Sequence, residues 1–156
     1  MFINKFHEKV PFLRGTIDKV MRHIDMPRSK GSIRTLLGRK CRFDKWEPMN
    51  WGVHKALSYE EAHAKHGPRI KRAFTYKALN RLIQGSAADQ TKAAMVALHK
   101  SGFNLLLQIH DEIALSVKNK SEAQEASIIM NDAVKEKLTV PVKTDIEIGQ
   151  SWGNAS

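Results

Sequence analysis

The sequence predicts an α+β domain in which helices pack a small antiparallel sheet. Apolar residues recur at helical spacing in several segments, and short β-favouring segments come in pairs around turns. These strand pairs lie between helices, an order typical of hairpins rather than of parallel βαβ units. The 156 residues, 42% hydrophobic and 27% charged, fit one globular domain or part of one. We treat residues 1–156 as a single partial domain.

The first part of the chain predicts one helix, one hairpin and one loop. Pro11 fits the first turn of a helix, where its missing N–H costs nothing, and Gly38-Arg39 fits a hairpin turn. The expected elements are a helix over residues 11–28, strands over 33–37 and 40–43, and a loop over 44–57.

Two further helices are predicted in the middle of the chain. Ser58 and Glu61 have the spacing of a capping box and begin a short helix that Gly67-Pro68 ends. A long helix follows over 69–100, with Gly85-Ser86 as a candidate break.

The last third predicts a hairpin, a helix and a final strand. Two β-favouring segments within residues 104–117 flank a polar tip. A second capping box, Ser121 to Gln124, begins a helix that Pro141 ends. Alternating apolar and polar residues over 142–148 predict a third strand of the sheet.

The charge is unevenly distributed along the chain. Lys and Arg total 26 against 16 Asp and Glu, a net charge of +10. Residues 1–92 hold 20 basic and 8 acidic residues, whereas residues 93–156 hold 6 and 8. Such a basic region favours a polyanionic partner, with nucleic acid the leading candidate and a solvated cationic surface the alternative. Arg34 and Arg39, in the first hairpin, are candidate phosphate contacts.

Several classes of protein are excluded by composition. No apolar segment approaches the roughly 18 residues of a membrane span, and the N-terminus lacks a secretory signal pattern. The single cysteine, Cys41, excludes an internal disulfide and a multi-cysteine zinc site. We therefore expect an intracellular protein without a membrane partner.

The tip of the second hairpin carries His110, Asp111 and Glu112. Adjacent carboxylates repel each other, so placing them on a rigid corner favours a bound cation. Mg²⁺ is bound in proteins through one or two carboxylates together with substrate phosphates. The alternative is a solvated acidic turn. His110 either orders a bound phosphate or is a turn residue without a role.

Asn80 and Gln84 lie four residues apart, on one face of the predicted long helix. Two amides so placed can donate to and accept from base or sugar edges, and Lys77 and Arg81 flank them. A polar helix face without a ligand is the alternative.

Four segments, taken together and in order, resemble the C-terminal palm region of family A DNA polymerases, the group of bacterial DNA polymerase I and the replicases of T7-like phages. They are GSIRTLLGRK at 31–40, resembling G-x-x-x-T-L-x-G-R-R; NRLIQGSAAD at 80–89, resembling N-x-x-x-Q-G-T-A-A-D; QIHDEI at 108–113, similar to motif C, Q-V-H-D-E; and 140–152, similar to the last strand and terminal Trp.

The resemblance implies functional roles. Asp111 is implied to be one of two aspartates that hold the catalytic Mg²⁺ pair, with Glu112 supporting it and His110 near the primer terminus. Asn80 and Gln84 are implied to contact the primer–template in the minor groove. The implied substrates are primer–template DNA and deoxynucleoside triphosphates, in the cytoplasm of a bacterial or phage-infected cell.

The sequence also departs from the family. Tyr76 stands where the family has Arg, with Lys77 or Arg72 as candidate substitutes. The motif A aspartate, the fingers, the thumb and the exonuclease find no match in these residues. Two-metal catalysis needs carboxylates from both motifs. We therefore expect no polymerase activity from this chain alone, and a second, N-terminal polymerase chain as partner.

Other interpretations remain. The chain can be a duplex-DNA-binding remnant of an interrupted polymerase gene, without catalysis. A metal-dependent nuclease built on His110, Asp111 and Glu112 would need further acidic ligands. An open sheet edge also predicts poor solubility or self-association.

Overall fold

A computed structural model describes residues 8–50, 52 and 54–154, and the chain divides into two compact units, residues 1–84 and 85–156. The described strands form three separate two-stranded antiparallel sheets, accompanied by helices. The predicted α+β class is therefore confirmed. No helix in the described part of the chain has the length and apolarity needed to cross a bilayer.

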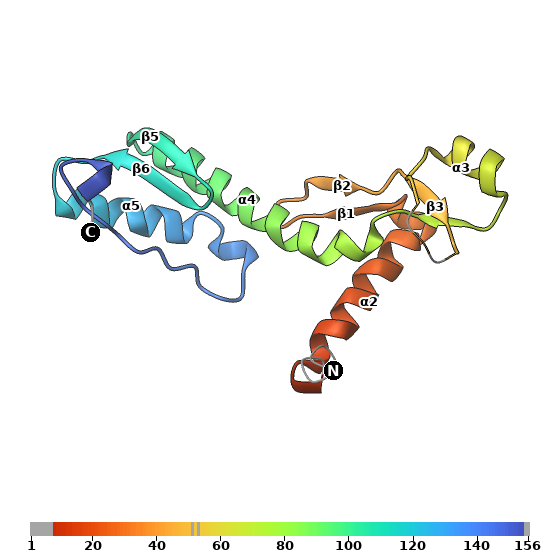
Figure 1. Ribbon diagram of the computed structural model, residues 1–156. Helices are drawn as coiled ribbons and strands as arrows, with labels where there is room; N and C mark the ends of the chain where they lie inside the picture. Colours follow the sequence, from red (N-terminus) through yellow and green to blue (C-terminus); the bar gives the residue numbers. More distant parts are fainter. Residues whose placement is uncertain (1–7, 51, 53, 155–156) are drawn as a thin grey trace. The chain divides into compact units, whose positions relative to one another are not determined.

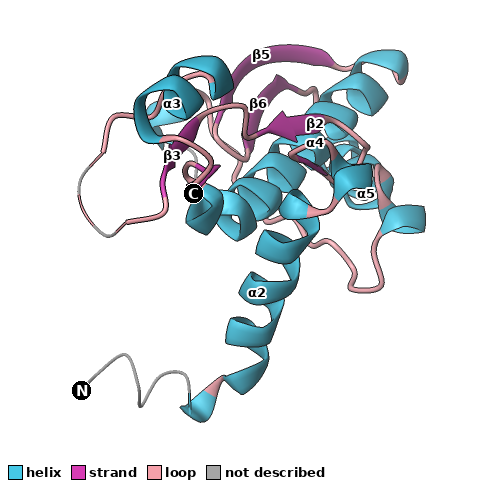
Figure 2. Ribbon diagram, turned by 90° about the vertical axis from the view of Figure 1, so that its right-hand side faces the viewer, coloured by secondary structure: helices cyan, strands magenta, loops and turns pink. Residues whose placement is uncertain are grey.

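The first unit begins with helix α2 (Pro11–Asp25) and the 3₁₀ helix η1 (Pro27–Ser29), followed by a hairpin of β1 (Ser32–Arg34) and β2 (Lys40–Arg42). Its core contains Ile24, Ile33, Phe43 and Ala78. The N-terminal part of α2 extends away from this hairpin (Figures 1 and 2). The predicted helix over 11–28 was too long, because Met26, which precedes a proline, has extended backbone.

A second small sheet in this unit was not predicted. Strand β3 (Trp46–Pro48) pairs with β4 (Ile70–Arg72), and helix α3 (Tyr59–His66) lies between them in the chain. The loop predicted over 44–57 is therefore wrong at 46–48, and residues 51 and 53 of it lie outside the described residues. Pairing of strands more than 20 residues apart leaves no local periodicity to detect.

The N-terminus of α3 confirms the predicted capping box. The Ser58 hydroxyl accepts a hydrogen bond from the Glu61 N–H at 3.2 Å, and the Glu61 carboxylate accepts one from the Ser58 N–H at 3.0 Å. These bonds satisfy donors that a helix end leaves unpaired.

Helix α4 (Ala78–Lys100) is continuous through Gly85-Ser86, so the candidate break was wrong. Its start was also predicted too early, since residues 70–72 form β4 and Thr75–Lys77 form the 3₁₀ helix η2. Gly102, with φ +87°, follows its C-terminus, and the Phe103 N–H donates to the Leu98 carbonyl at 3.1 Å. The helix therefore ends as predicted.

The second unit is built on a hairpin of β5 (Asn104–Ile109) and β6 (Glu112–Ser116) and on helix α5 (Lys120–Asp132). Leu98, Phe103 and Ala126 form its core, and Leu105 and Leu115 of the hairpin pack against them. The hairpin therefore lies against α5 and the C-terminal part of α4 (Figure 1). The predicted hairpin over 104–117 is confirmed.

Three predictions about the end of the chain were wrong. Helix α5 is capped by Asn119 instead of beginning at the Ser121 box, and it ends at Asp132 before the short 3₁₀ helix η3 (Lys135–Lys137). Residues 142–148 form no strand, because no described strand lies beside them to complete a ladder. A final 3₁₀ helix, η4 (Trp152–Asn154), includes Trp152, whose side chain is outside the description.

Candidate functional site

The turn that joins β5 to β6 contains only His110 and Asp111. Ile109 pairs with Glu112 as the last rung of the ladder, so the two residues between them close the hairpin. His110 has φ +53°, a left-handed conformation that costs a non-glycine residue about 1–2 kcal/mol. The side-chain amide of Gln108 donates a hydrogen bond to the His110 carbonyl and stabilises this turn.

The side chains of His110, Asp111 and Glu112 are exposed. Within the described residues, no hydrogen bond or ion pair engages the carboxylates of Asp111 and Glu112. Two neighbouring carboxylates without a basic partner repel each other, and a bound cation would relieve that repulsion. Burial of Asp111 among apolar side chains, which would exclude metal binding, is not observed.

Carboxylate oxygens at this tip suit a hard cation such as Mg²⁺. Across the ranges 8–50, 52 and 54–154, no group of three or more His, Cys, Asp or Glu side chains could hold a metal ion. The hairpin can therefore supply one or two ligands, and a complete site needs others from substrate, water or another polypeptide.

Asn80 and Gln84 lie on an exposed face of α4 within the first unit. Ile83, between them, is 56% exposed, so the stripe is amide at both ends and apolar at its centre. The opposite side of the helix packs inward through Ala78 and Leu82. The predicted common face is therefore present, and both amides are available to a ligand.

Arg81 and Lys77, predicted to flank this face, make contacts within the protein. The Arg81 guanidinium lies 5.0 Å from the Phe43 ring centroid and donates to the Cys41 Sγ at 3.9 Å. The Lys77 ammonium lies 5.2 Å from the Phe74 ring centroid and 5.6 Å from that of Tyr76. Arg81 thus joins α4 to the first hairpin, while Lys77 remains exposed.

The two arginines of the first hairpin are both exposed. Arg34 donates from Nη1 to the Gly38 carbonyl at 2.8 Å and so braces the turn. Arg39 follows that turn, where its carbonyl accepts from the Thr35 N–H at 3.0 Å. Both arginines present charge to solvent as expected.

Arg72, a candidate substitute for the family arginine that Tyr76 replaces, has a structural position. Its Nη1 donates to the Phe43 carbonyl at 2.8 Å, and its guanidinium lies 4.6 Å from the Trp46 ring centroid. Tyr76 itself is 66% exposed. Arg72 therefore connects β4 to the first hairpin, and Lys77 is the better placed of the two candidates.

The predicted site residues fall into the two units. The acidic hairpin tip belongs to residues 85–156, whereas the amide face and the arginines belong to residues 1–84. Gln108, which entered the analysis only as a letter of a motif, positions the turn. Its place two residues before the tip, on the same strand, was the signal available in the sequence.

Comparison with known proteins confirms the resemblance. Residues 1–154 match DNA polymerase family A. The DNA-directed DNA polymerase of Pseudomonas phage M6 is 40% identical over 154 residues, covering 98% of this chain and 19% of that protein. DNA polymerase I of Streptococcus pneumoniae is 31% identical over 163 residues, covering 99% and 16%. The thermostable DNA polymerase I of Thermus filiformis is 29% identical over 157 residues, covering 97% and 16%.

A solved structure shares the fold. The POL domain of Pol1 from M. smegmatis, in complex with DNA primer-template and dNTP, superposes with a TM-score of 0.65 at 22% identity. The match covers 98% of this chain and 25% of that one. The 156 residues therefore span less than a third of these relatives.

Proposed function

Because this chain belongs to DNA polymerase family A, we propose that it forms the C-terminal part of a polymerase active centre. The observation that carries the proposal is the tight β5–β6 turn, which holds Asp111 and Glu112 exposed and without partners among the described residues. The proposed reaction joins deoxynucleoside triphosphates to a DNA primer. Its proposed location is the cytoplasm of a bacterial or phage-infected cell, where such replication takes place.

In this proposal Asp111 holds catalytic Mg²⁺ and Glu112 supports it. The exposed oxygens fit that ion, because Mg²⁺ is bound through few carboxylates and completes its shell with water and phosphate oxygens. Bound metal ions would stabilise the attacking and leaving oxygens of the phosphoryl transfer. The left-handed His110 and the Gln108 amide keep the carboxylates at the tip, and His110 faces the primer terminus.

Asn80 and Gln84 are proposed to bind the minor groove of the primer–template. Amide side chains can donate to the purine N3 and pyrimidine O2 acceptors that all base pairs present there. Their exposed common face, with Ile83 between them, permits such contact. Recognition of this kind does not depend on base sequence, as replication requires. Arg34, Arg39 and Lys77 are proposed to contact phosphates.

A second carboxylate is required from outside these residues. Two-metal catalysis places carboxylates around ions about 3.5–4 Å apart, and the described residues offer no group of three ligands. We propose that a second polymerase chain supplies the missing aspartate and the triphosphate-binding residues. The isolated chain then does not extend a primer.

A chimera tests this proposal without knowledge of the natural partner. The 156 residues replace the matching segment of the Pseudomonas phage M6 polymerase, which is 40% identical over 154 residues. The chimera should extend a primer, and Asp111→Asn should lower its kcat by about 1000-fold or more, since one metal ligand supports electrostatic stabilisation worth several kcal/mol. Primer extension in Mg²⁺ is the measurement.

The matched control is Asp132→Asn, which removes an exposed carboxylate of α5 that pairs with Lys135 at 2.6 Å. This variant should extend the primer as the unmodified chimera does. Extension by the Asp111→Asn chimera at the unmodified rate would overturn the metal role. Extension by the purified 156-residue chain alone would overturn the need for a second chain.

A duplex-DNA-binding remnant is the second candidate function. The excess of 20 basic over 8 acidic residues in 1–92 favours it, because DNA affinity requires no metal ligands. In that case the chimera binds primer–template but fails to extend it, with or without Asp111. The chimera assay thus separates the two candidates.

A further inference from the structure

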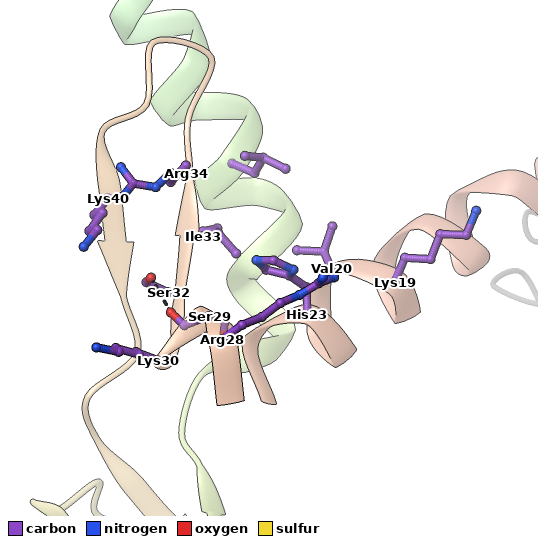
Figure 3. Close-up of a pocket in the computed structure, with 11 residues that line it drawn as sticks. Lys19, Val20, His23, Arg28, Ser29, Lys30, Ser32, Ile33, Arg34 and Lys40 are labelled. Atoms are coloured by element: carbon purple, nitrogen blue, oxygen red, sulfur yellow. Dashed lines mark hydrogen bonds between the residues drawn. The ribbon is translucent and has the colours of Figure 1, made fainter. Parts of the chain in front are cut away.

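The first unit contains a pocket of about 730 Å³ that the proposed catalytic and minor-groove residues do not use. Cationic side chains dominate its lining, and none of the lining residues is acidic. These cations are Lys19, Arg28, Lys30, Arg34 and Lys40, and the His23 ring lies among them (Figure 3).

The fold brings these cations together from three elements. Lys19 and His23 lie one turn apart on α2, and Arg28 lies in η1. Lys30 has φ +49° at the end of η1, and Gly31 continues the left-handed turn into β1. This sharp turn brings the η1 cations beside the strands of the hairpin (Figure 3).

Two of the cations are held directly opposite each other. Arg34 of β1 and Lys40 of β2 are Cα partners in the antiparallel ladder. Like charges in such a pair destabilise a sheet by a few tenths of a kcal/mol, on the order of 0.2–1 kcal/mol. An anion bound between them would reverse the sign of that contribution. The fold therefore favours an anionic ligand at this position.

The hydroxyl groups of the pocket are already engaged. Ser29 donates to the Ile24 carbonyl at 2.7 Å, and Ser32 donates to the Ser29 carbonyl at 2.7 Å. Recognition must therefore come from the cations, which suits phosphate groups better than neutral sugars. Val20, Ile33 and Leu82 add apolar surface to the lining.

We infer that this pocket binds the sugar–phosphate backbone of single-stranded nucleic acid and receives one nucleotide. Several separate cations fit successive phosphates of a strand, and the apolar surface beside His23 fits a sugar or base. A duplex keeps its bases paired inside and presents a convex backbone, so it cannot enter a hollow in this way. The inference rests on the proposed function, because it adds a strand-binding site to a polymerase segment.

The double variant Arg28→Ala/Lys40→Ala tests the inference in the full 156-residue chain. Both side chains are exposed, and no hydrogen bond of either side chain to another described residue is present. We expect the affinity for a fluorescent oligo-dT strand, measured by anisotropy, to fall roughly tenfold at low salt. The slope of log K against log salt should fall by about 1.4, since each single-strand phosphate contact contributes about 0.7.

The matched control is Lys65→Ala/Lys92→Ala, which removes two exposed lysines that do not line the pocket. It should lose less affinity and keep its slope. Arg28→Gln/Lys40→Gln keeps side-chain length without charge and should repeat the loss, which excludes an effect of folding. An equal loss in the control, or an unchanged slope in the pocket variants, would overturn the inference.

Two competitors distinguish the sources of phosphate. A paired duplex should lose much less affinity than oligo-dT in the pocket variants, and deoxynucleoside triphosphate should displace oligo-dT only weakly. An equal loss for the duplex would assign the cations to duplex DNA, and strong displacement would assign a triphosphate site; either result overturns the inference. Strand binding is measured without primer extension, so a failed inference leaves the Asp111 chimera result intact, and the reverse also holds.

Discussion

Gly31 shows how one residue can be required by the fold rather than by the chemistry. Its φ is +71°, and a Cβ added there would lie 2.3 Å from the Arg72 Cζ. The Arg72 guanidinium occupies that space while it donates to the Phe43 carbonyl and stacks on Trp46. The first glycine of the motif at 31–40 therefore makes room for the residue that connects two sheets of the first unit.

We predict that Gly31→Ala destabilises the protein by about 2 kcal/mol. The left-handed backbone disfavours Ala by roughly 1 kcal/mol, and displacement of Arg72 removes a hydrogen bond worth roughly 1–2 kcal/mol. Urea denaturation gives the free energy of unfolding. Gly15→Ala is the control, since nothing lies within 4 Å of a Cβ at that position of α2. It should be stabilising by roughly 0.5–1 kcal/mol, and equal effects of both changes would contradict the explanation.

Residue types alone did not distinguish structural from solvent-facing cations. Arg72 and Arg81 each occupy an aromatic ring of the first unit, whereas Lys77 stays exposed beside two rings. All are basic residues near a motif, so the sequence predicts the same role for each. Their partners, Trp46 and Phe43, lie 26 and 38 residues away along the chain. Only the folded contacts separate the roles.

At the scale of elements, two helix starts had similar sequence signals and different outcomes. Ser58 caps α3 as its spacing to Glu61 predicts. Ser121 has the same kind of spacing to Gln124, yet the Asn119 side chain accepts from the Glu122 N–H at 3.0 Å and caps α5. Asn is at least as good a cap as Ser. The Glu122 carboxylate also accepts from the Lys118 N–H at 2.6 Å, which completes the earlier start.

Asn119→Ala should therefore destabilise the protein by about 1 kcal/mol, the usual cost of removing a helix cap. Ser121→Ala serves as its control and should change stability by less than about 0.5 kcal/mol, because Ser121 lies inside the helix and Ala favours helix. Thermal and urea denaturation of both variants measure the difference. A larger loss in Ser121→Ala would show that the helix begins at the later box.

The α3 cap also predicts a dependence of stability on pH. The Ser58 N–H, and after it the Ser58 hydroxyl, hydrogen-bond the Glu61 carboxylate and hold the pKa of Glu61 below its ordinary value of 4.5. The unfolded chain then binds more protons than the folded one near this pKa, so the contribution is complete above pH 4.5. It is lost as the pH falls through the lower folded value.

Glu61→Gln should accordingly lower the melting temperature at about pH 6 and make a smaller difference at about pH 3.5. Gln cannot titrate, so the variant lacks this part of the acid sensitivity. Glu60→Gln, in the same first turn but outside the box, is the control. A difference between the wild-type chain and Glu61→Gln that stays constant over this range would contradict the lowered pKa of Glu61.

At the scale of the molecule, local signals predicted more than long-range pairing did. The β5–β6 hairpin and the end of α4 follow from residues close together in the chain, and both are confirmed. The β3–β4 sheet joins residues 46–48 to 70–72 and could not be read locally. The strand expected over 142–148 alternates correctly, but a ladder also requires a neighbouring strand. The acidic tip was predictable because its whole geometry lies within one hairpin.

The same dependence on neighbours leads to a prediction about association. Among the described strands, β5 pairs only with β6, and its Leu106 and Leu107 are 62% and 47% exposed. An open strand edge with exposed leucines is a template for pairing with another chain. We therefore expect the isolated chain to self-associate at micromolar concentration in multi-angle light scattering.

Leu106→Gln/Leu107→Gln should shift the chain toward monomer, because it removes apolar surface from both faces of the open strand. Leu37→Gln is the matched control, since Leu37 is 48% exposed but lies in the first hairpin turn. That variant should associate as the wild-type chain does. A wild-type chain that is monomeric throughout the micromolar range would mean that the β5 edge is protected within the chain itself. The surface proposed to receive a second polymerase chain would then have to lie elsewhere.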